Sequence, residues 1–577
     1  MCRQARLDFS LNGGSLKIST QNHSFRLAAT AAATLLVAVV AFVTSPKGGI
    51  SAEYLDQKVV WESCPVSVHD PEDAWTKAEK RSEVTCATVL VPADYSGNAS
   101  PEFKLQLARL HDPKNKSPLG SIFINPGGPG GSGVDQLFQA ELPKELLSKY
   151  DFIGFDPRAV GFSDFADGSE FKCDNLLAYR EKFGAPNFAN TLDELKADYV
   201  ARRDYLTDCA AKNPFWWTIN TDNMVRDLEV LRASVTRDKP LNFIGTSYGT
   251  VLAARYVASY PEHVGKIVLD SPALADEMSE EDSLASDAAT EARLTNYLKG
   301  YARHANISVD AAWNRLLEVK RSAQDHELVG YAGLEKDFYD EETDSWFMKS
   351  TEDFLIDGIE GLSYLPIEDA REEFNACLDA AYENQVNDCF EFYALSMWGM
   401  SVEDGEMDGI IDSYDIDRDN SNELIQIVWS LEYEAPVEPL SETQSQLAYD
   451  RFKNAAPKFS QLYLSQEDPG KLPKNIKTYS WRSLAIDDPT IPDPPKSQTK
   501  IENRSGKQVL VIGGARDSVT PFHQAKKIAK QLNAALIKVD TDEHGSAASY
   551  DNECVNAVLV SYFTRAGKIP SSVCSGR

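Results

Sequence analysis

The sequence predicts an α/β fold with a mostly parallel central sheet and a large, mainly helical insertion. Apolar runs at residues 121–124, 241–244 and 508–514 have the length of buried strands, and glycine or polar turn residues follow each. After a further strand-like run at residues 266–270, the next one does not come until residue 508, and the pattern between them is mostly helical. So long a connection must carry structure of its own. A chain of 577 residues also exceeds one typical core.

A serine stands at the turn between one of these strands and a predicted helix. The motif Gly-Thr-Ser-Tyr-Gly at residues 245–249 follows the run 241–244 and precedes the helix-like residues 251–257. Glycine at both ends lets the strand and helix backbones approach closely, and strain at the tip presents the serine oxygen. Ser247 is therefore the candidate nucleophile, although so short a motif also fits an ordinary strand-to-helix loop.

An acid and a histidine follow Ser247, in the chain order found in folds that place a catalytic serine at such a turn. Asp517 comes just past the strand at residues 508–514, at the carboxyl end, where sites collect in open α/β sheets. His544 follows another predicted strand at residues 535–540. Taken alone, Asp517 fits an acid in an ordinary turn, and His544 fits an exposed histidine in a loop. Serine, acid and base in this order on strand ends predict a catalytic triad.

A glycine-rich segment precedes the serine motif. Residues 125–133, Asn-Pro-Gly-Gly-Pro-Gly-Gly-Ser-Gly, follow the strand at residues 121–124. Glycine lets backbone amides turn toward a ligand without a Cβ in the way. In acyl transfer such amides stabilise the oxyanion of the tetrahedral intermediate, and we expect those of Gly128 and Tyr248 to do so. No Gly-Lys-Ser/Thr ending follows, which disfavours a phosphate-binding loop.

These motifs resemble the α/β-hydrolase fold and, more narrowly, the secreted tripeptidyl aminopeptidase and prolyl aminopeptidase relatives among serine peptidases. The resemblance rests on residues 125–130, 155–158 with Gly161 and Ser163, 245–250, 269–272, 517–521, 544–545, Cys554, 567–570 and Cys574. It places nucleophile, acid and base on Ser247, Asp517 and His544. The chain departs from the pattern at Ala159 and Val160, where these relatives usually carry a single glycine.

The resemblance implies a serine exopeptidase that releases short peptides or residues from substrates with free amino termini. No cofactor is expected, because acyl-enzyme chemistry is complete within the triad. A carboxylic ester hydrolase would use the same triad, since a fold does not fix a substrate. A catalytically inactive binding protein on a hydrolase scaffold is disfavoured, because it has no chemical need for all three residues.

The charge of the chain excludes one class of partner. The chain has 58 Lys and Arg against 88 Asp and Glu, a net charge of -30. Phosphate recognition needs clustered cations, so nucleic acid is not expected as a partner. We expect the acidity to keep an exported protein soluble.

The amino terminus predicts export. One apolar stretch spans residues 27–43 and follows a segment with several basic residues and a single acid, Asp8. Residues 1–52 are expected to be a cytoplasmic tail with either a signal peptide, cleaved near residues 50–52, or a signal anchor that spans the membrane once. The two alternatives stay open. The protein is then secreted, or membrane-anchored with its catalytic domain on the extracytoplasmic side.

The cysteines agree with export. Cys2 precedes the apolar stretch, and the eight that follow form an even number, which fits a disulfide set. Proximity in sequence suggests Cys64 with Cys86, Cys173 with Cys209, Cys377 with Cys389, and Cys554 with Cys574. Glycosylation sequons occur at several positions, among them Asn98, Asn306 and Asn503.

The core is expected to come from two separated parts of the chain. Residues 53–275 carry the oxyanion loop and the nucleophile, and residues 501–577 carry the acid and the base. Between them, residues 276–500 are expected to form a helical cap above the carboxyl edge of the sheet, because long insertions of this kind are commonly lids. Residues 488–495 are rich in proline and predict a rigid exposed connector back to the core.

One acidic segment of the insertion has the spacing of a calcium-binding loop. Residues 404–415 carry acids at loop positions 1, 3, 5, 9 and 12 and glycine at position 6. The acids are Asp404, Glu406, Asp408, Asp412 and Asp415. The short side chain at position 12 hinders the bidentate final ligand, and glutamate at position 3 is unusual. A solvated acidic turn is therefore favoured over a metal site.

Overall fold

The computed structural model describes residues 49–65, 84–97, 100–116, 118–139, 142–173, 179, 182–183, 192–237, 239–275, 279–323, 339–340, 345–346, 359, 367–383, 427–428, 431–432, 442–462, 499–547 and 552–576. The described residues within Ile50–Asp94 and Ala99–Arg577 belong to one compact unit. Several predicted features lie outside the described residues: the apolar stretch 27–43, the sequon residue Asn98, the acidic loop 404–415 and the connector 488–495. No described helix is long and apolar enough to cross a membrane.

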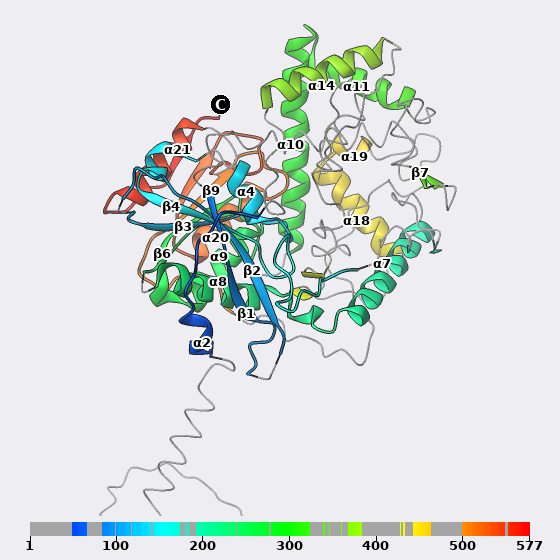
Figure 1. Ribbon diagram of the computed structural model, residues 1–577. Coiled ribbons are helices and arrows are strands. Elements are labelled where there is room, and N and C mark those ends of the chain that lie inside the picture. Colours follow the sequence, from blue (N-terminus) through cyan, green and yellow to red (C-terminus); the bar gives the residue numbers. More distant parts are fainter. Residues whose placement is uncertain are drawn as a thin grey trace, which may run out of the picture. The chain divides into compact units, whose positions relative to one another are not determined.

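The described core contains one nine-stranded sheet with the order β1-β2-β4-β3-β5-β6-β9-β10-β11 (Figure 1). The strands are β1 (Val84–Pro92), β2 (Glu102–Leu110), β3 (Gly120–Asn125), β4 (Tyr150–Phe155), β5 (Leu241–Thr246), β6 (Val264–Asp270), β9 (Val509–Gly514), β10 (Ala535–Val539) and β11 (Ser572–Cys574). β2 pairs antiparallel with β1 and β4, and the other neighbours pair in parallel. The predicted, mostly parallel sheet is confirmed.

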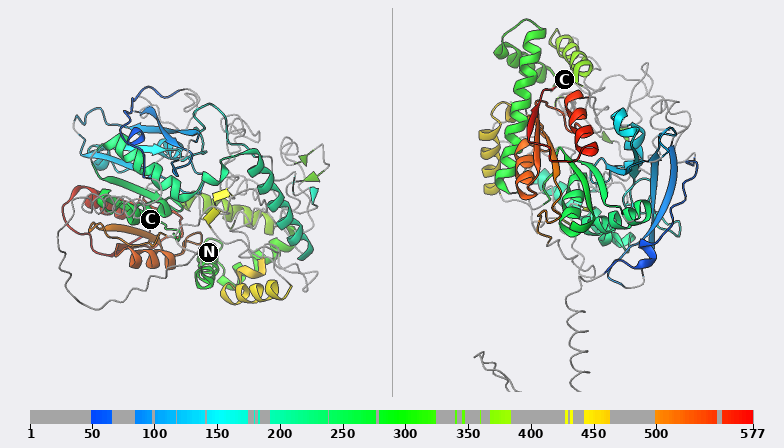
Figure 2. Two further views of the ribbon diagram at one scale, coloured as in Figure 1. Left: turned by 90° about the horizontal axis from the view of Figure 1, so that it is seen from below. Right: turned by 90° about the vertical axis from the view of Figure 1, so that its left-hand side faces the viewer.

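Helices cover this sheet, which explains its apolar strands. Every residue of β4 and β9 is buried, as expected for parallel strands covered on both faces. One buried cluster joins the strands to α4 (Gly133–Gln139), α5 (Lys144–Leu147) and α21 (Glu553–Thr564). The helices α8 (Thr221–Thr236), α9 (Gly249–Ser259) and α20 (Phe522–Gln531) pack against β1, β5, β6, β9 and β10 (Figure 2).

The strand order fixes where the glycine-rich segment and the serine motif meet. β3 pairs with β4 on one side and with β5 on the other. The connections that leave β3 and β5 therefore diverge at a topological switch point, where ligands bind in open α/β sheets. Asn125 at the end of β3 pairs with Gly245 near the end of β5. The sheet register thus brings the two motifs side by side.

A buried ion pair anchors the segment that follows β4. This segment contains α7 (Leu192–Lys212) and the short η2 (Trp216–Thr218) ahead of α8. Arg158 is fully buried and donates from Nε and Nη2 to the two carboxylate oxygens of Asp227 on α8, at 2.7 and 2.6 Å. Its Nη1 donates to the carbonyl oxygens of Ala93 and Thr218. The neighbouring Ala159 has a φ of 63°, a left-handed conformation that glycine adopts more readily.

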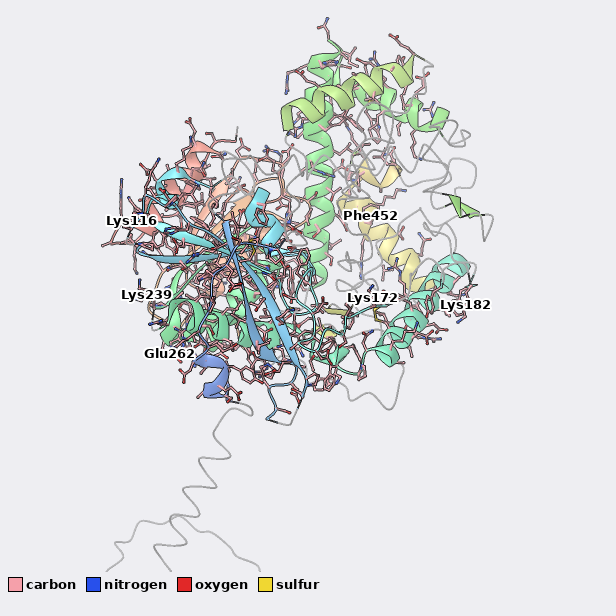
Figure 3. The ribbon with its side chains drawn as sticks, in the orientation of Figure 1. Lys116, Lys172, Lys182, Lys239, Glu262 and Phe452 are labelled. Atoms are coloured by element: carbon pink, nitrogen blue, oxygen red, sulfur yellow. A yellow bond between two sulfur atoms is a disulfide. The ribbon has the colours of Figure 1, made fainter. Side chains whose placement is uncertain are left out.

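The chain between β6 and β9 contains helices with a core of their own. They are α10 (Glu280–His304), α11 (Val309–Ala323), α14 (Ile367–Tyr382), α18 (Glu442–Ala455) and α19 (Phe459–Leu462). Leu298, Leu316, Phe374 and Leu462 are fully buried in one cluster between them. Figure 3 labels Phe452 of α18. Its ring lies edge-on to that of Phe459, with ring centroids 6.4 Å apart. A short strand pair, β7 (Tyr339–Asp340) with β8 (Ser345–Trp346), was not predicted from the sequence.

Charged side chains join these helices to the sheet domain. The carboxylate of Asp282, in the first turn of α10, lies 2.8 Å from Lys527 Nζ on α20. Arg371 of α14 lies 2.6 Å from the buried carboxylate of Asp542, which follows β10. Arg255 of α9 lies 2.5 Å from Glu432. The helical segment therefore contacts the core through ion pairs at several elements.

Three of the four predicted disulfides are confirmed. They join Cys64 to Cys86, Cys173 to Cys209, and Cys554 to Cys574. Cys377 is also disulfide-bonded, and its expected partner Cys389 lies outside the described residues. The remaining short elements are α2 (Ala52–Leu55), which packs on α8, and η3 (Pro261–His263).

Candidate active site

Ser247 occupies a strained turn between β5 and α9. Its φ of 53° lies in the left-handed region, which costs a non-glycine residue about 1–2 kcal/mol. The turn is tight: a Cβ on Gly245 would lie 2.4 Å from the carbonyl oxygen of Gly249, and one on Gly249 would lie 2.6 Å from that of Asn125. Glycine is therefore required at both positions, as the sequence motif predicted. The Ser247 amide donates to the carbonyl oxygen of Asp270, at 3.1 Å.

Asp517 and His544 are in direct contact beyond the ends of β9 and β10. His544 Nδ1 lies 3.0 Å from Asp517 Oδ2. The amides of Val519 and Thr520 each donate to Asp517 Oδ1 at 2.9 Å, and Thr520 Oγ1 lies 2.9 Å from Oδ2. Asp517 is completely buried. The aspartate is thus fixed by several donors, and it orients the imidazole through Nδ1.

Burial and neighbouring charges shift the pKa values of Asp517 and His544 in opposite directions. Burial raises the pKa of Asp517, but the positive charge of His544 and hydrogen bonds from His544, Thr520 and Ser271 outweigh it, so this pKa lies below its usual range. Burial lowers the pKa of His544, whereas the charges of Asp517 and Asp270 and the Asp517 hydrogen bond raise it above its usual value. The site therefore stabilises an imidazolium beside a carboxylate.

The glycine-rich segment lies directly against the serine turn. A Cβ on Gly127 would come within 2.6 Å of the Thr246 carbonyl oxygen and 2.7 Å of the Tyr248 amide nitrogen. Gly127 and Gly128 have φ values of 102° and 98°, which favour glycine. Within the described chain, the Gly128 amide donates no hydrogen bond to the protein. The Gly128 and Tyr248 amides named from the sequence belong to these adjoining segments.

Asp156, for which the sequence suggested no role, fixes the other end of this segment. It is fully buried after β4 and accepts hydrogen bonds from Ser132 Oγ at 2.6 Å, from the Val134 amide at 3.2 Å and from the Phe162 amide at 3.1 Å. Burial, with a smaller effect of Asp135, raises the pKa of Asp156 to about 7. Its place just past a buried strand was the signal available in the sequence.

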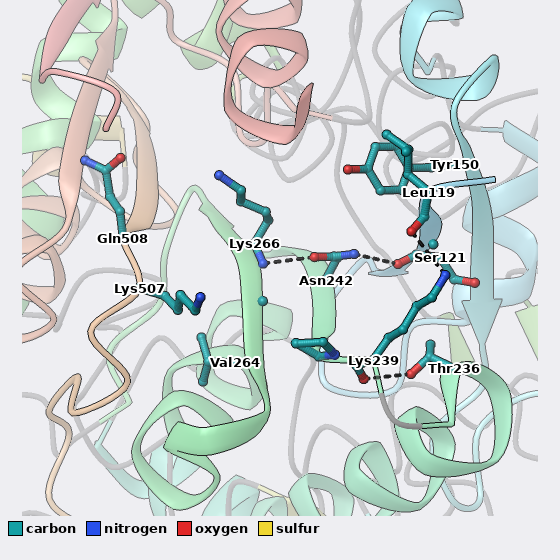
Figure 4. Close-up of a pocket in the computed structure, with 13 residues that line it drawn as sticks. Leu119, Ser121, Tyr150, Thr236, Lys239, Asn242, Val264, Lys266, Lys507 and Gln508 are labelled. Atoms are coloured by element: carbon teal, nitrogen blue, oxygen red, sulfur yellow. Dashed lines mark hydrogen bonds between the residues drawn. The ribbon is translucent and has the colours of Figure 1, made fainter. Parts of the chain in front are cut away.

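A separate pocket lies at the opposite edge of the sheet. It has a volume of about 370 Å³ and is lined by residues at the beginnings of β3, β4, β5, β6 and β9 (Figure 4). Three lysines contribute to it: Lys239, Lys266 and Lys507. Ser247, Asp517 and His544 follow the carboxyl ends of parallel strands. The pocket is therefore not part of the candidate site.

The described residues contain no cluster of three or more His, Cys, Asp or Glu side chains able to hold a metal ion. The acidic loop 404–415 lies outside them and stays a prediction.

Comparisons with known proteins agree with the fold. A family model for the alpha/beta hydrolase fold matches residues 120–355, and one for TAP-like proteins matches residues 480–574. A tripeptidyl aminopeptidase of Streptomyces coelicolor is 30% identical over 223 residues, 37% of this chain and 37% of that protein. Serine protease Hip1 of Mycobacterium tuberculosis is 29% identical over 304 residues, 52% of this chain and 55% of that protein.

A third relative matches more of the chain at lower identity. Carboxylesterase B of Mycobacterium tuberculosis is 25% identical over 534 residues, 89% of both proteins. The matches with the tripeptidyl aminopeptidase and with Hip1 span only 37% and 55% of those proteins. From its sheet, its serine turn and these matches, we conclude that the chain has the α/β-hydrolase fold and is similar in sequence to tripeptidyl aminopeptidases.

Proposed function

We propose that the protein is a serine hydrolase with Ser247 as nucleophile, His544 as general base and Asp517 as the acid that orients the base. The observation that carries the proposal is the 3.0 Å contact between His544 Nδ1 and Asp517 Oδ2, at the sheet edge where Ser247 occupies a strained turn. A neutral imidazole held at Nδ1 presents Nε2 as the acceptor for a serine proton.

The reaction would proceed through an acyl-enzyme. Ser247 Oγ attacks the scissile carbonyl carbon as its proton passes to His544 Nε2, and the carbonyl oxygen becomes an oxyanion stabilised by the Gly128 and Tyr248 amides. The intermediate then expels the leaving amine, which takes the proton from His544. Water, deprotonated by His544, attacks the acyl-enzyme, and the bond to Ser247 Oγ breaks as His544 returns that proton to Oγ, which releases the acid product and restores the enzyme.

We further propose that the substrates are short peptides with a free amino terminus. Relatives that are named tripeptidyl aminopeptidase and serine protease support a peptidase. A second observation supports restricted access of substrates to the candidate active site. Asn296 of α10 and Arg371 of α14 both lie 2.6 Å from Asp542 Oδ2, two residues before His544. A helical cap held so near the base would admit extended peptides and exclude folded proteins.

An ester hydrolase is the second candidate. It rests on the relative named carboxylesterase B, whose match covers 89% of this chain. The proposed triad performs acyl transfer on esters and amides alike, so the distinction lies in substrate recognition.

Export is proposed from the disulfides. Three bonds among the described residues, at the amino-terminal strand, in the segment after β4 and at the carboxyl terminus, indicate an oxidising compartment. Secretion and a membrane anchor at residues 27–43 both fit this proposal.

A matched set of substrates tests the function. Turnover of di- and tripeptide amides with free amino termini is compared with that of the acetylated peptides and of a short-chain ester, with Ser247→Ala as the blank. An exopeptidase must bind the substrate ammonium, so acetylation should reduce kcat/KM strongly. Equal rates on free and acetylated peptides would exclude amino-terminal specificity. Ester turnover without amide turnover would move the assignment to an esterase.

A further inference from the structure

Two adjacent residues at the end of β6 form hydrogen bonds with the Ser247 turn and with the segment that follows His544. The carbonyl oxygen of Asp270 accepts the amide hydrogen of Ser247. The Asp270 carboxylate accepts the amides of Ser546 and Ala547, just after His544. The hydroxyl oxygen of Ser271 accepts the Gly545 amide at 2.8 Å. Three consecutive amides after the base are thus held by this pair.

Ser271 also reaches the acid. Its hydroxyl helps to keep the pKa of Asp517 low. Its carbonyl oxygen accepts Thr520 Oγ1 at 2.8 Å, and Thr520 lies against both Asp517 and His544. The Ser271 amide donates to Ile512 of β9, so the pair is attached to the strand that carries the acid.

The pair carries features that stability alone does not explain. Asp270 and Ser271 are 0% and 1% exposed. Ser271 has a φ of 46°, a strained conformation that persists only where the surroundings hold it. Asp270 Oδ1 is buried and has no hydrogen-bond partner among the described residues. Backbone strain such as that of Ser271 is concentrated at functional sites.

The charge of Asp270 acts on the base. The acidic groups that face His544 in the described chain are Asp517 and Asp270, and both raise its pKa. Burial raises the pKa of Asp270 itself to about 6, against the opposing effects of the Ser546 and Ala547 amides and of His544. Above this pH, Asp270 carries a negative charge beside the base.

We propose that Asp270 and Ser271 are positioning residues of the triad: the Asp270 carboxylate stabilises the His544 imidazolium and holds the chain after it, and the Ser271 hydroxyl holds the Gly545 amide beside the acid. The inference rests on the proposed function, because it assigns these residues a part in the same reaction. Neither residue is expected to touch the substrate.

Asp270→Asn isolates the effect of the charge, because asparagine keeps an oxygen that can accept the two amides. Without the negative charge His544 loses a proton more easily, so the acid limb of the kcat/KM profile should move to lower pH, by about one unit. The imidazolium formed during reaction is less stable by the same factor, so kcat should fall about tenfold. KM should stay unchanged.

Ser271→Gly isolates the hydroxyl and tolerates the positive φ, so the variant should fold. It should lower kcat and the rate of fluorophosphonate labelling at unchanged KM. Asp282→Asn, another buried carboxylate, on α10, is the matched control and should leave the acid limb in place. A folded Asp270→Asn or Ser271→Gly protein with wild-type kcat and pH profile would overturn the inference. Failure of the proposed function is recognised separately, by turnover that persists in Ser247→Ala.

Discussion

Asp517 holds the imidazole of His544 through a 3.0 Å contact at Nδ1, and the aspartate is itself completely buried. The two pKa shifts have opposite signs for one reason: each charged form stabilises the other. The folded state therefore favours the ion pair. This state resembles the one that forms when His544 takes the proton of Ser247, so the pair is organised before substrate arrives.

Asp517→Asn should abolish most activity without unfolding the protein. Asparagine fits the same space but cannot stabilise the imidazolium, and it can hold the imidazole in the wrong tautomer. The corresponding change in a serine protease triad lowers kcat about 10⁴-fold, and we expect a loss of similar order here. Steady-state kcat and the melting temperature measure the two effects. A folded variant with more than a tenth of wild-type kcat would contradict the role of Asp517.

The activity should depend on the ionisation of His544, and the sign follows from its raised pKa. The base must be neutral to accept a proton, so kcat/KM should rise with pH through a midpoint above about 6.5. For stability the same shift has another consequence. The charged His544 stabilises the folded state. This contribution to the free energy of unfolding is fully present below about pH 6.5, and it is lost as pH rises through the pKa of His544 in the folded protein. A midpoint well below 6.5 would show that a different group limits the rate.

Gly127→Ala should inactivate the enzyme by displacing the serine turn. The new Cβ would lie 2.6 Å from the Thr246 carbonyl oxygen and 2.9 Å from Ser247 Cβ, and both atoms belong to the nucleophile turn. Gly168→Ala is the matched control, because Gly168 has a similar φ of 86° but a Cβ there would meet no atom within 4 Å. Both variants bear the backbone strain. Only Gly127→Ala should lose kcat by two orders of magnitude or more, roughly the effect of a lost oxyanion donor. Equal activities would contradict the placement of this loop.

Asp227→Ala should destabilise the fold far more than the loss of an exposed ion pair. It leaves the Arg158 guanidinium buried without its carboxylate, which typically costs about 3–5 kcal/mol. Glu170→Ala removes the exposed partner of Lys172 and should change the free energy of unfolding by less than about 1 kcal/mol. Denaturant unfolding at neutral pH compares the two variants. Similar losses would mean that the buried pair does not anchor the segment after β4.

The strands and the order of the site residues could be predicted from the sequence for a physical reason. β3, β5, β6 and β9 are buried on both faces, so they are apolar runs ended by turn residues. Ser247, Asp517 and His544 each follow such a run, and parallel strands bring their carboxyl ends to one edge. Short separations in sequence likewise allowed three cysteine pairs to be named.

The supporting contacts could not be predicted in this way, because they depend on sheet register and packing. Asp270 reaches the amides of Ser546 and Ala547 across 276 and 277 residues of sequence. Its position beside Ile512 follows from the pairing of β6 with β9. Likewise, nothing near Arg158 in the sequence identifies Asp227 as its partner. The sequence shows that acids such as Asp270 stand at strand ends, but it does not show which residues they contact.

The central claim is that Ser247 is the nucleophile, and the most direct measurement is covalent labelling by a fluorophosphonate followed by intact mass and peptide mapping. We expect one adduct per chain, on the peptide that contains Ser247. We also expect no adduct and no turnover in a folded Ser247→Ala protein, and slowed labelling in His544→Ala. Stoichiometric labelling of Ser247→Ala at another serine, with turnover retained, would contradict the assignment.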